Sequence, residues 1–158
     1  MRVVATLGFL CMILVLAPLS RGAPQAGSPA AGTEDYSGMY SFLREGEFMQ
    51  VTIEEKGKVS GFVSRFGDSE TDRGAFLDQF FKSGKFDTNN LSFTTESVHG
   101  SWFTFEGVFE RGPGKKPEDE AYYVLRGTLT RFVTDAEKKT TSEARRVEFK
   151  SFPRDAAR

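Results

Sequence analysis

Few residues in this chain could perform chemistry, because its 158 residues include one histidine and one cysteine. The histidine, His99, stands in Ser97–Ser101, a segment typical of a tight turn between strands. A serine nucleophile needs an oriented base and a sharp strand-to-helix turn, and the residues around His99 provide neither. We therefore expect a turn histidine and no catalytic residue.

Oxygen ligands for a metal appear in the series Asp68-x-Glu70-x-Asp72. A calcium loop begins in this way, but it also requires Gly at the sixth position and Glu at the twelfth. Those positions hold Arg73 and Gln79. The series therefore predicts a solvated acidic loop, and we expect no metal site and no cofactor.

The overall composition excludes further classes of function. A formal net charge of −1 gives no electrostatic reason to expect nucleic acid as a partner. The 22 acidic residues show no spacing that singles out a catalytic pair, and Glu106 with Arg126 is expected to be a cross-strand ion pair. An enzyme is therefore the third hypothesis, behind two binding functions.

The first segment of the chain has the layout of a targeting signal. Arg2 precedes an apolar run that ends at Leu19, and Ser20-Arg21-Gly22 offers small residues for cleavage. We predict a secretory signal peptide at residues 1–22, with an uncleaved membrane anchor as the alternative. Cleavage would leave no stable membrane span and no cysteine. The protein is then expected outside the cytoplasm, secreted, extracellular or periplasmic.

The rest of the chain is predicted to hold one domain. Residues 23–33 are small, with Pro and Gly, and predict a flexible tether, while residues 154–158 predict a disordered tail. Between them, at 34–153, aromatic or branched residues alternate with polar ones, as in β-strands. The expected strands are 36–43, 47–54, 58–66, 80–86, 91–98, 101–111, 121–132 and 144–152. Residues 74–79 have the apolar spacing of a short helical turn.

Turn geometry supports one buried face for these strands. The loop Glu45-Gly46 would place Tyr40 opposite Val51, and the loop Glu55–Gly57 would place Ile53 opposite Val59. A hairpin around 112–120 would place Gly107 opposite Leu125. All three registers put the apolar residues on the same side of the sheet.

Glycines in the middle of strands predict how the sheet curves. Gly38, Gly61, Gly84, Gly107 and Gly127 each interrupt a strand with apolar neighbours two residues away. Glycine weakens a strand unless the chain must bend or a large side chain needs room. We therefore predict an all-β fold, an eight-stranded antiparallel up-and-down barrel, with a β-sandwich as the alternative.

At this point the chain resembles the calycin group, the lipocalin-like and avidin-like secreted barrels. Gly38-Met39-Tyr40 is similar to the Gly-x-Trp that opens lipocalins, and Thr134-Asp135-Ala136 to their later Thr-Asp-Tyr. Arg145 or Arg146 would stand where lipocalins keep an Arg beneath the first-strand aromatic residue. The resemblance implies a closed barrel that binds a small ligand.

The first functional hypothesis is therefore an exported, non-enzymatic barrel that binds a small apolar or aromatic ligand. Four inward aromatic residues are the predicted ligand-binding set: Tyr36, Tyr40, Tyr123 and Phe103. Their phenol groups and rings would line a residual pocket in an interior that is otherwise filled by side chains.

The second hypothesis uses the outward face. Four aromatic residues there are the predicted partner-binding set: Phe62, Trp102, Tyr122 and Phe132. A contiguous apolar patch would indicate a protein partner, a homodimer or a structural role in the cell envelope. Alternatively, Phe76, Leu77, Phe80 and Phe81 would cover the patch as an internal lid.

Overall fold

The computed structural model describes residues 35–68 and 72–155. The predicted signal peptide and tether, and residues 156–158 of the predicted tail, lie outside the described residues. Eight strands and one short 3-10 turn follow one another: β1 (Gly38–Ser41), β2 (Phe48–Ile53), η1 (Glu55–Gly57), β3 (Val59–Phe66), β4 (Phe76–Asp87), β5 (Asn90–Thr95), β6 (Ser101–Arg111), β7 (Tyr123–Thr134) and β8 (Thr140–Lys150). Within this described part, no helix is long and apolar enough to span a bilayer.

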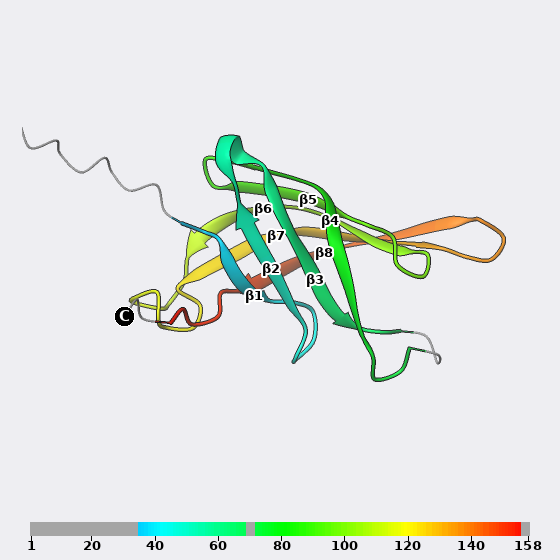
Figure 1. Cartoon of the computed structure of the whole chain (residues 1–158), viewed down its shortest axis with the longest axis horizontal. Helices are drawn as coiled ribbons and strands as arrows, with labels where there is room; N and C mark the ends of the chain where they lie inside the picture. Colours follow the sequence, from blue (N-terminus) through cyan, green and yellow to red (C-terminus); the bar gives the residue numbers. More distant parts are fainter. Residues whose placement is uncertain (1–34, 69–71, 156–158) are drawn as a thin grey trace, which may run out of the picture. The chain divides into compact units, whose positions relative to one another are not determined.

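The strands form one curled sheet in which each strand pairs antiparallel with the next (Figure 1). An antiparallel bridge joins Tyr40 to Ser151, which directly follows β8. The amide of Phe152 also donates to the carbonyl of Met39 over 2.9 Å. This short contact between β1 and the end of β8, called the seam below, closes the sheet. The predicted eight-stranded up-and-down barrel is confirmed.

The β7–β8 hairpin extends past the rest of the barrel (Figure 1). Residues 140–146 of β8 are all exposed. Because β1 has four residues, it meets only the end of β8 at the seam. The barrel is therefore tightly closed at one end and more open at the end from which this hairpin projects.

The register between β2 and β3 is the predicted one. Ile53 lies opposite Val59, and Met49 lies opposite Val63. The connecting turn η1 bends through a positive φ of 74° at Gly57, which glycine adopts without steric cost. A short turn with one permitted geometry therefore determined this register from the sequence alone.

The registers across the other two predicted hairpins differ by two residues from expectation. Tyr40 lies opposite Met49 because the amide of Phe42 bonds to the carbonyl of Glu47, which makes a four-residue loop. Gly107 lies opposite Gly127 rather than Leu125. An even shift keeps every side chain on its original face, so the predicted buried face survives both corrections.

The helical turn predicted at residues 74–79 is wrong. The chain is extended from Phe76 onward as β4, and Phe76 and Phe80 pair with Phe66 and Phe62 of β3. Pairing with β3 satisfies the backbone groups along this segment, and this tertiary contact outweighs the helical spacing of the apolar residues. Phe76 and Phe80 therefore face solvent instead of forming a lid.

The barrel interior is filled by side chains of the predicted face. Aromatic rings make up more than half of this buried set, and Ile53 and Val147 are only partly buried and pack against its margin. Its members are Tyr36, Tyr40, Phe42, Met49, Val51, Val59, Val63, Leu91, Phe93, Phe103, Phe105, Phe109, Tyr123, Leu125, Leu129 and Phe149.

Two facing glycines make room for one of these rings. The ring of Phe105 lies across Gly107 and Gly127, and a Cβ atom on either glycine would approach its Cζ to 2.4 or 2.7 Å. Such distances are shorter than any carbon–carbon contact in a packed core. Strands β6 and β7 can therefore hold a phenylalanine flat against their backbones only because both residues lack side chains.

Candidate functional site

Three of the four predicted ligand-binding residues lie together at the closed end of the barrel. The ring of Tyr36 stacks on Phe109 at 4.6 Å between centroids and meets Tyr123 edge-on at 4.7 Å. Tyr40 packs on the same Phe109 at 5.6 Å. All of these rings are buried, so ring-to-ring contacts occupy the space between the three tyrosines.

The hydroxyl of Tyr40 takes part in this packing. It donates a hydrogen bond of 2.6 Å to the carbonyl oxygen of Tyr36. Burial raises the pKa of this phenol well above its ordinary value, because the anion would have no water around it. The nearby Arg154 opposes the shift only in part. The hydroxyl therefore acts as a structural donor inside the closed end.

The fourth predicted residue, Phe103, lies at the opposite, open end and lines a cavity of about 160 Å³. Loops that follow β1 and β3, with the inward sides of β3, β6, β7 and β8, provide its walls. We call this cavity the arginine mouth. Its lining residues are Leu43, Arg44, Glu47, Arg65, Asp68, Phe103, Arg131 and Arg145.

Arg65 forms the floor of the arginine mouth, and it is only 4% exposed. Its Nε donates to Oε1 of the fully buried Gln79 over 2.6 Å, and its Nη1 donates to Asp68 over 2.8 Å. The guanidinium also lies 5.5 Å above the ring centre of Phe103, at cation–π distance. Burial lowers the pKa of Arg65, and the repulsion from Arg131 adds to the effect, although Asp68 opposes it.

One carboxylate serves three arginines in this cavity. Asp68 accepts hydrogen bonds from Arg131 at 2.7 Å, from Arg65 at 2.8 Å and from Arg44 at 3.3 Å. A carboxylate has two oxygens and can balance one positive charge. The guanidinium groups therefore converge on Asp68 with more positive charge than it neutralises.

Glu47 is the other acidic residue that lines the arginine mouth. Its hydrogen bonds connect the loop after β1 to the end of β3. It is 2% exposed, and it accepts from the amide of Arg44 at 3.0 Å, from Nε of Arg44 at 2.8 Å and from the amide of Phe66 at 3.0 Å. The loop after β1 is thereby fixed to the end of β3. Glu47 sets the shape of the cavity wall.

Arg145 completes the lining from β8. Its side chain makes no hydrogen bond or ion pair with any residue in 35–68 or 72–155. Together the cavity holds four guanidinium groups and two carboxylates, a formal excess of two positive charges. This arrangement suits an anion, because each arginine presents a planar fork of donors.

A second hollow of about 260 Å³ adjoins the mouth and shares Arg65, Asp68 and Arg131 with it. His99 lies at its rim, in the tight turn predicted for it, and its Nδ1 lies 2.8 Å from Asp72. Asp68 and Asp72 thus bond to cationic or imidazole groups. In the described part of the chain no three His, Cys, Asp or Glu side chains gather in a way that would hold a metal.

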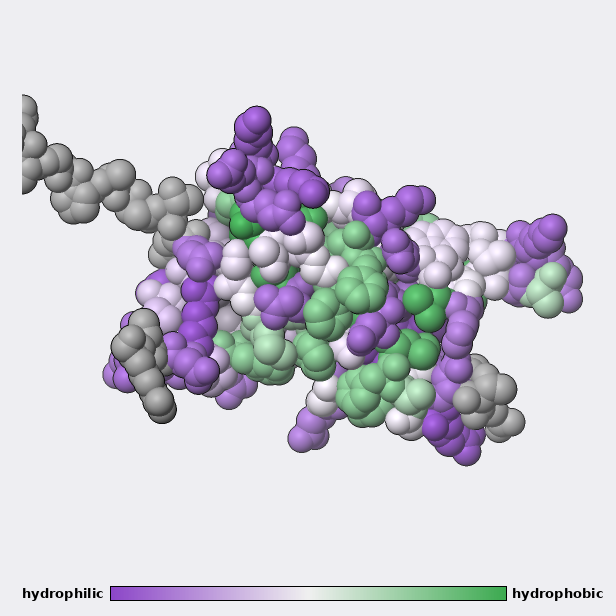
Figure 2. Space-filling view, in the orientation of Figure 1, coloured by the Kyte–Doolittle hydropathy of each residue, from purple (hydrophilic) through white to green (hydrophobic). Residues whose placement is uncertain are grey.

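The structure divides the four predicted partner-binding residues among three places. Trp102 stacks on Phe132 at 5.1 Å across β6 and β7. Tyr122 lies 3.6 Å from the guanidinium of Arg111. Phe62 belongs to a separate hydrophobic area on the face formed by β2, β3 and β4 (Figure 2). Sequence spacing could not place these residues because the curl of the sheet turns β3 away from β6 and β7.

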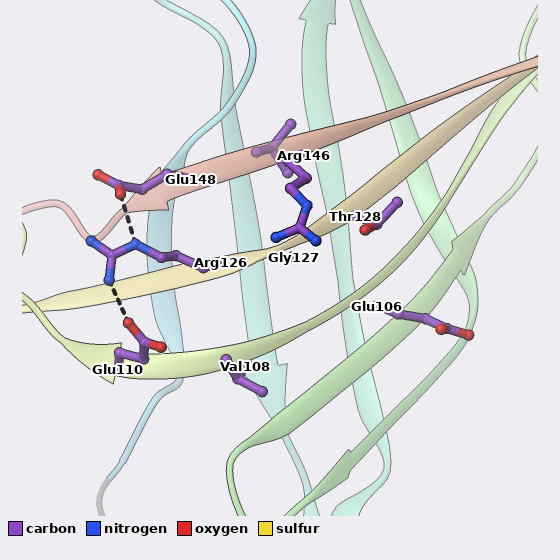
Figure 3. Close-up of a pocket in the computed structure, with 9 residues that line it drawn as sticks. Glu106, Val108, Glu110, Arg126, Gly127, Thr128, Arg146 and Glu148 are labelled. Atoms are coloured by element: carbon purple, nitrogen blue, oxygen red, sulfur yellow. Dashed lines mark hydrogen bonds and ion pairs between the residues drawn. The ribbon is translucent and has the colours of Figure 1, made fainter.

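A hollow of about 640 Å³ lies on the outer side of β6, β7 and β8 (Figure 3). Three of its charged groups bond to one another, because Arg126 bridges Glu110 and Glu148, and Glu106 and Arg146 lie beside them along the solvated face. The predicted pair of Arg126 with Glu106 is wrong, since the two-residue shift places Glu106 opposite Thr128. This hollow is a shallow area between side chains of a solvated sheet face, so we place the candidate site at the arginine mouth.

Neither of the two arginines predicted to lie beneath the aromatic residue of the first strand occupies that place. Arg145 lines the open mouth and Arg146 the outer hollow. Instead, Arg154 reaches the closed end, where its Nη2 donates to the carbonyls of Asp35 at 2.6 Å and Ser37 at 2.5 Å.

Sequence reasoning did not identify the arginine mouth, although a signal was present. Arg65, Arg131 and Arg145 each stand at an inward position, two residues from the buried Val63 and Leu129 or the partly buried Val147. Arginine is rarely buried unless it is paired or needed. Arginines at inward positions of three strands therefore indicate a polar site inside the barrel, although their meeting at one mouth is visible only in the structure.

The sequence matches no protein-family model and no curated protein. Solved avidin-like structures resemble the fold. A rhizavidin–biotin complex shares 11% identity and a TM-score of 0.55, over 78% of this chain and 98% of that one. A short afifavidin–biotin complex shares 14% identity and a TM-score of 0.54, over 76% and 91%. Apo short afifavidin shares 15% identity with this chain and has a TM-score of 0.52, over 79% of this chain and 98% of that one. The predicted calycin-like barrel is thus confirmed at the level of the fold.

Proposed function

We propose that this protein binds a small organic anion, an apolar or aromatic carboxylate, at the arginine mouth. The observation that carries the proposal is the excess of guanidinium groups over carboxylates around one cavity. Arg65 is buried there, so its charge is costly unless an anion lies nearby. Asp68 supplies part of that charge, and a ligand carboxylate would supply the rest.

The shape of the cavity supports a ligand with an apolar part. Phe103 and Leu43 are the apolar residues of its lining, and the guanidinium of Arg65 lies over the Phe103 ring. A volume of about 160 Å³ would hold an anionic head group and one ring or a short alkyl chain. The filled interior beyond Phe103 leaves no room for deeper insertion. The ligand is therefore expected to bind at the open end only.

The fold agrees with a binding function rather than with catalysis. The rhizavidin and short afifavidin structures that resemble the chain were solved with biotin bound. The nucleophile and base geometry that hydrolysis requires is not suggested by His99, whose ring bonds to an aspartate in a turn. With the predicted signal peptide, we propose a ligand-binding role outside the cytoplasm.

The test uses two ligands of equal shape and different charge. Benzoate should bind the protein, and benzamide should bind at least about tenfold more weakly, because only benzoate gains charge-assisted hydrogen bonds. Arg145→Gln should weaken benzoate binding about five- to tenfold. Isothermal titration calorimetry measures each Kd. Added salt should weaken the binding of the charged benzoate and leave the binding of the neutral benzamide unchanged.

The matched control is Arg146→Gln, which removes the same charge from the next residue of β8 on the outer side of the barrel. It should leave the affinity for benzoate unchanged. Equal affinities for benzoate and benzamide, or equal effects of the two arginine substitutions, would contradict the proposal. Biotin is titrated in parallel, and biotin binding that is insensitive to Arg145→Gln would place that ligand elsewhere.

A further inference from the structure

A second surface lies on the outer side of the barrel, away from the arginine mouth. Apolar side chains gather there, among polar ones, on the face of β1 to β4 (Figure 2). We call this surface the outer aromatic face. Its members are Met39, Phe48, Phe62, Phe66, Phe76 and Phe80.

The rings of this face are ordered against one another while they remain open to solvent. Phe62 meets Phe48 at 5.9 Å and Phe80 at 5.6 Å between centroids, and Phe66 meets Phe76 at 4.4 Å. Phe80 is nevertheless 55% exposed and Phe76 is 50% exposed. Single exposed apolar residues are common, but a contiguous aromatic patch marks a surface that another molecule covers.

The strand registers arrange part of this face as a row across the sheet, which follows the curve of the barrel. Met39 lies opposite Gln50, Gln50 opposite Phe62, and Phe62 opposite Phe80. On β4 the row passes between two exposed charges, because Asp78 and Lys82 lie two residues before and after Phe80. Asp78 points to the same side as Phe80, and Lys82 is exposed beside the row at the bulge of β4 between Phe81 and Ser83.

We propose that the outer aromatic face binds a second copy of this chain, with a two-fold axis along the row. Rotation about that axis brings the two β4 strands together face to face and antiparallel. Asp78 then meets the partner's Lys82, and Lys82 meets the partner's Asp78. Phe80 faces the partner's Phe80 on the axis itself.

The chemistry of the row favours a second copy over other occupants. A lipid surface would leave the Gln50 amide and the Asp78 carboxylate without polar partners, which is unfavourable. An added peptide strand needs a free sheet edge, but β2, β3 and β4 are each paired on both sides. A symmetric copy provides aromatic rings for the rings and the opposite charge for each charge.

The test measures the mass of the protein in solution by sedimentation over a range of concentrations. We expect a dimer, and we expect Phe80→Ser to convert it to a monomer, since an exposed residue can be changed without loss of the fold. Asp78→Lys and Lys82→Asp should each weaken dimerisation about tenfold or more, because each replaces two attractive contacts by two repulsive ones. The double variant Asp78→Lys/Lys82→Asp should restore the dimer.

Glu106→Lys is the matched control for charge, because it makes the same change on the exposed outer side of β6. It should leave the dimer unaffected. A monomer at every concentration overturns the proposal, and so does a dimer that persists in Phe80→Ser. A double charge variant as weak as the single ones also overturns it, since only a symmetric pairing predicts the restoration. The dimer does not depend on ligand binding at the arginine mouth.

Discussion

A single hydroxyl shows how the closed end of the barrel sets the chemistry of its residues. Tyr40 is fully buried, and its hydroxyl donates a hydrogen bond to the carbonyl oxygen of Tyr36. The folded structure therefore requires the neutral phenol. Its pKa is raised by burial, whereas the same phenol in the unfolded chain ionises near its ordinary value of about 10. This difference links the stability of the barrel to pH.

The sign of that link gives a prediction. Below about pH 10 the phenol is neutral in both states and contributes its full stability. Above about pH 10 only the unfolded chain loses the proton, so stability falls as pH rises towards the folded pKa, by up to about 1.4 kcal/mol per pH unit. Urea unfolding at about pH 8 and about pH 11 should show a larger loss for the wild type than for Tyr40→Phe.

At the lower pH, Tyr40→Phe should cost about 1 kcal/mol, because the Tyr36 carbonyl loses its donor. Tyr122→Phe, which changes a half-buried ring at the surface, should retain the wild-type loss at high pH. If Tyr40→Phe and the wild type lose the same stability at high pH, the phenol of Tyr40 ionises freely and our account of the closed end is wrong.

At the scale of elements, local geometry decided which parts of the fold could be predicted. The β2–β3 register followed from the three-residue turn Glu55–Gly57, whose glycine requires a positive φ. The loop before Glu47 was longer than expected because the buried Glu47 side chain bonds to Arg44 and to Phe66 on another strand. That tertiary contact has no local signature, so the β1–β2 register could not be read from the sequence.

The paired glycines of β6 and β7 give a prediction at this scale. Gly107→Ala should destabilise the barrel by about 2–3 kcal/mol, because the added methyl group overlaps the Phe105 ring and the carbonyl of Arg126. Chemical denaturation measures the loss. The responsible neighbours are the Phe105 ring and the carbonyl of Arg126, not Leu125 as the predicted register would have it.

Thr104→Ala is the control, since it alters an outward residue of the same strand and should change stability by less than about 0.5 kcal/mol. A further variant, Gly107→Ala combined with Phe105→Leu, should recover part of the loss by removing the far end of the ring. No recovery would show that the backbone of β7, rather than the ring, sets the limit.

At the scale of the whole molecule, closure depends on few contacts. The seam joins residues more than a hundred positions apart, through Tyr40 and Ser151. Ser151 also accepts a hydrogen bond from the amide of Tyr123 on its hydroxyl at 3.0 Å, and its own amide donates to the carbonyl of Tyr123 at 2.9 Å. This one serine therefore connects β1, β7 and the end of β8.

Ser151→Ala should consequently cost about 1–2 kcal/mol, because the buried amide of Tyr123 is left without an acceptor. Hydrogen exchange should become faster at the amides of Tyr123 and Tyr40, near the seam, than in β2 and β3. Ser142→Ala, in the exposed part of β8, should change neither stability nor exchange. If the amides of Tyr123 and Tyr40 exchange no faster in Ser151→Ala than in Ser142→Ala, the seam does not open locally.

The candidate site could not be predicted for a reason that also belongs to this scale. Arg44, Arg65, Arg131 and Arg145 come from four separate segments, and only the curl of the complete sheet brings them around Asp68. The sequence indicated which face each strand buries, because that depends on a period of two. It did not indicate which strand ends meet, because that depends on the stagger of the closed barrel.

The projecting β7–β8 hairpin offers a practical means of reporting occupancy of the mouth. Its tip at Asp135–Lys139 is exposed and held by its own hydrogen bonds, while its base carries Arg131 and Arg145. The single cysteine of the chain lies at position 11, so Glu137→Cys would give a labelling position within the barrel domain. With a solvatochromic dye attached there, the protein would become a reagentless optical sensor for the anion proposed to bind at the arginine mouth.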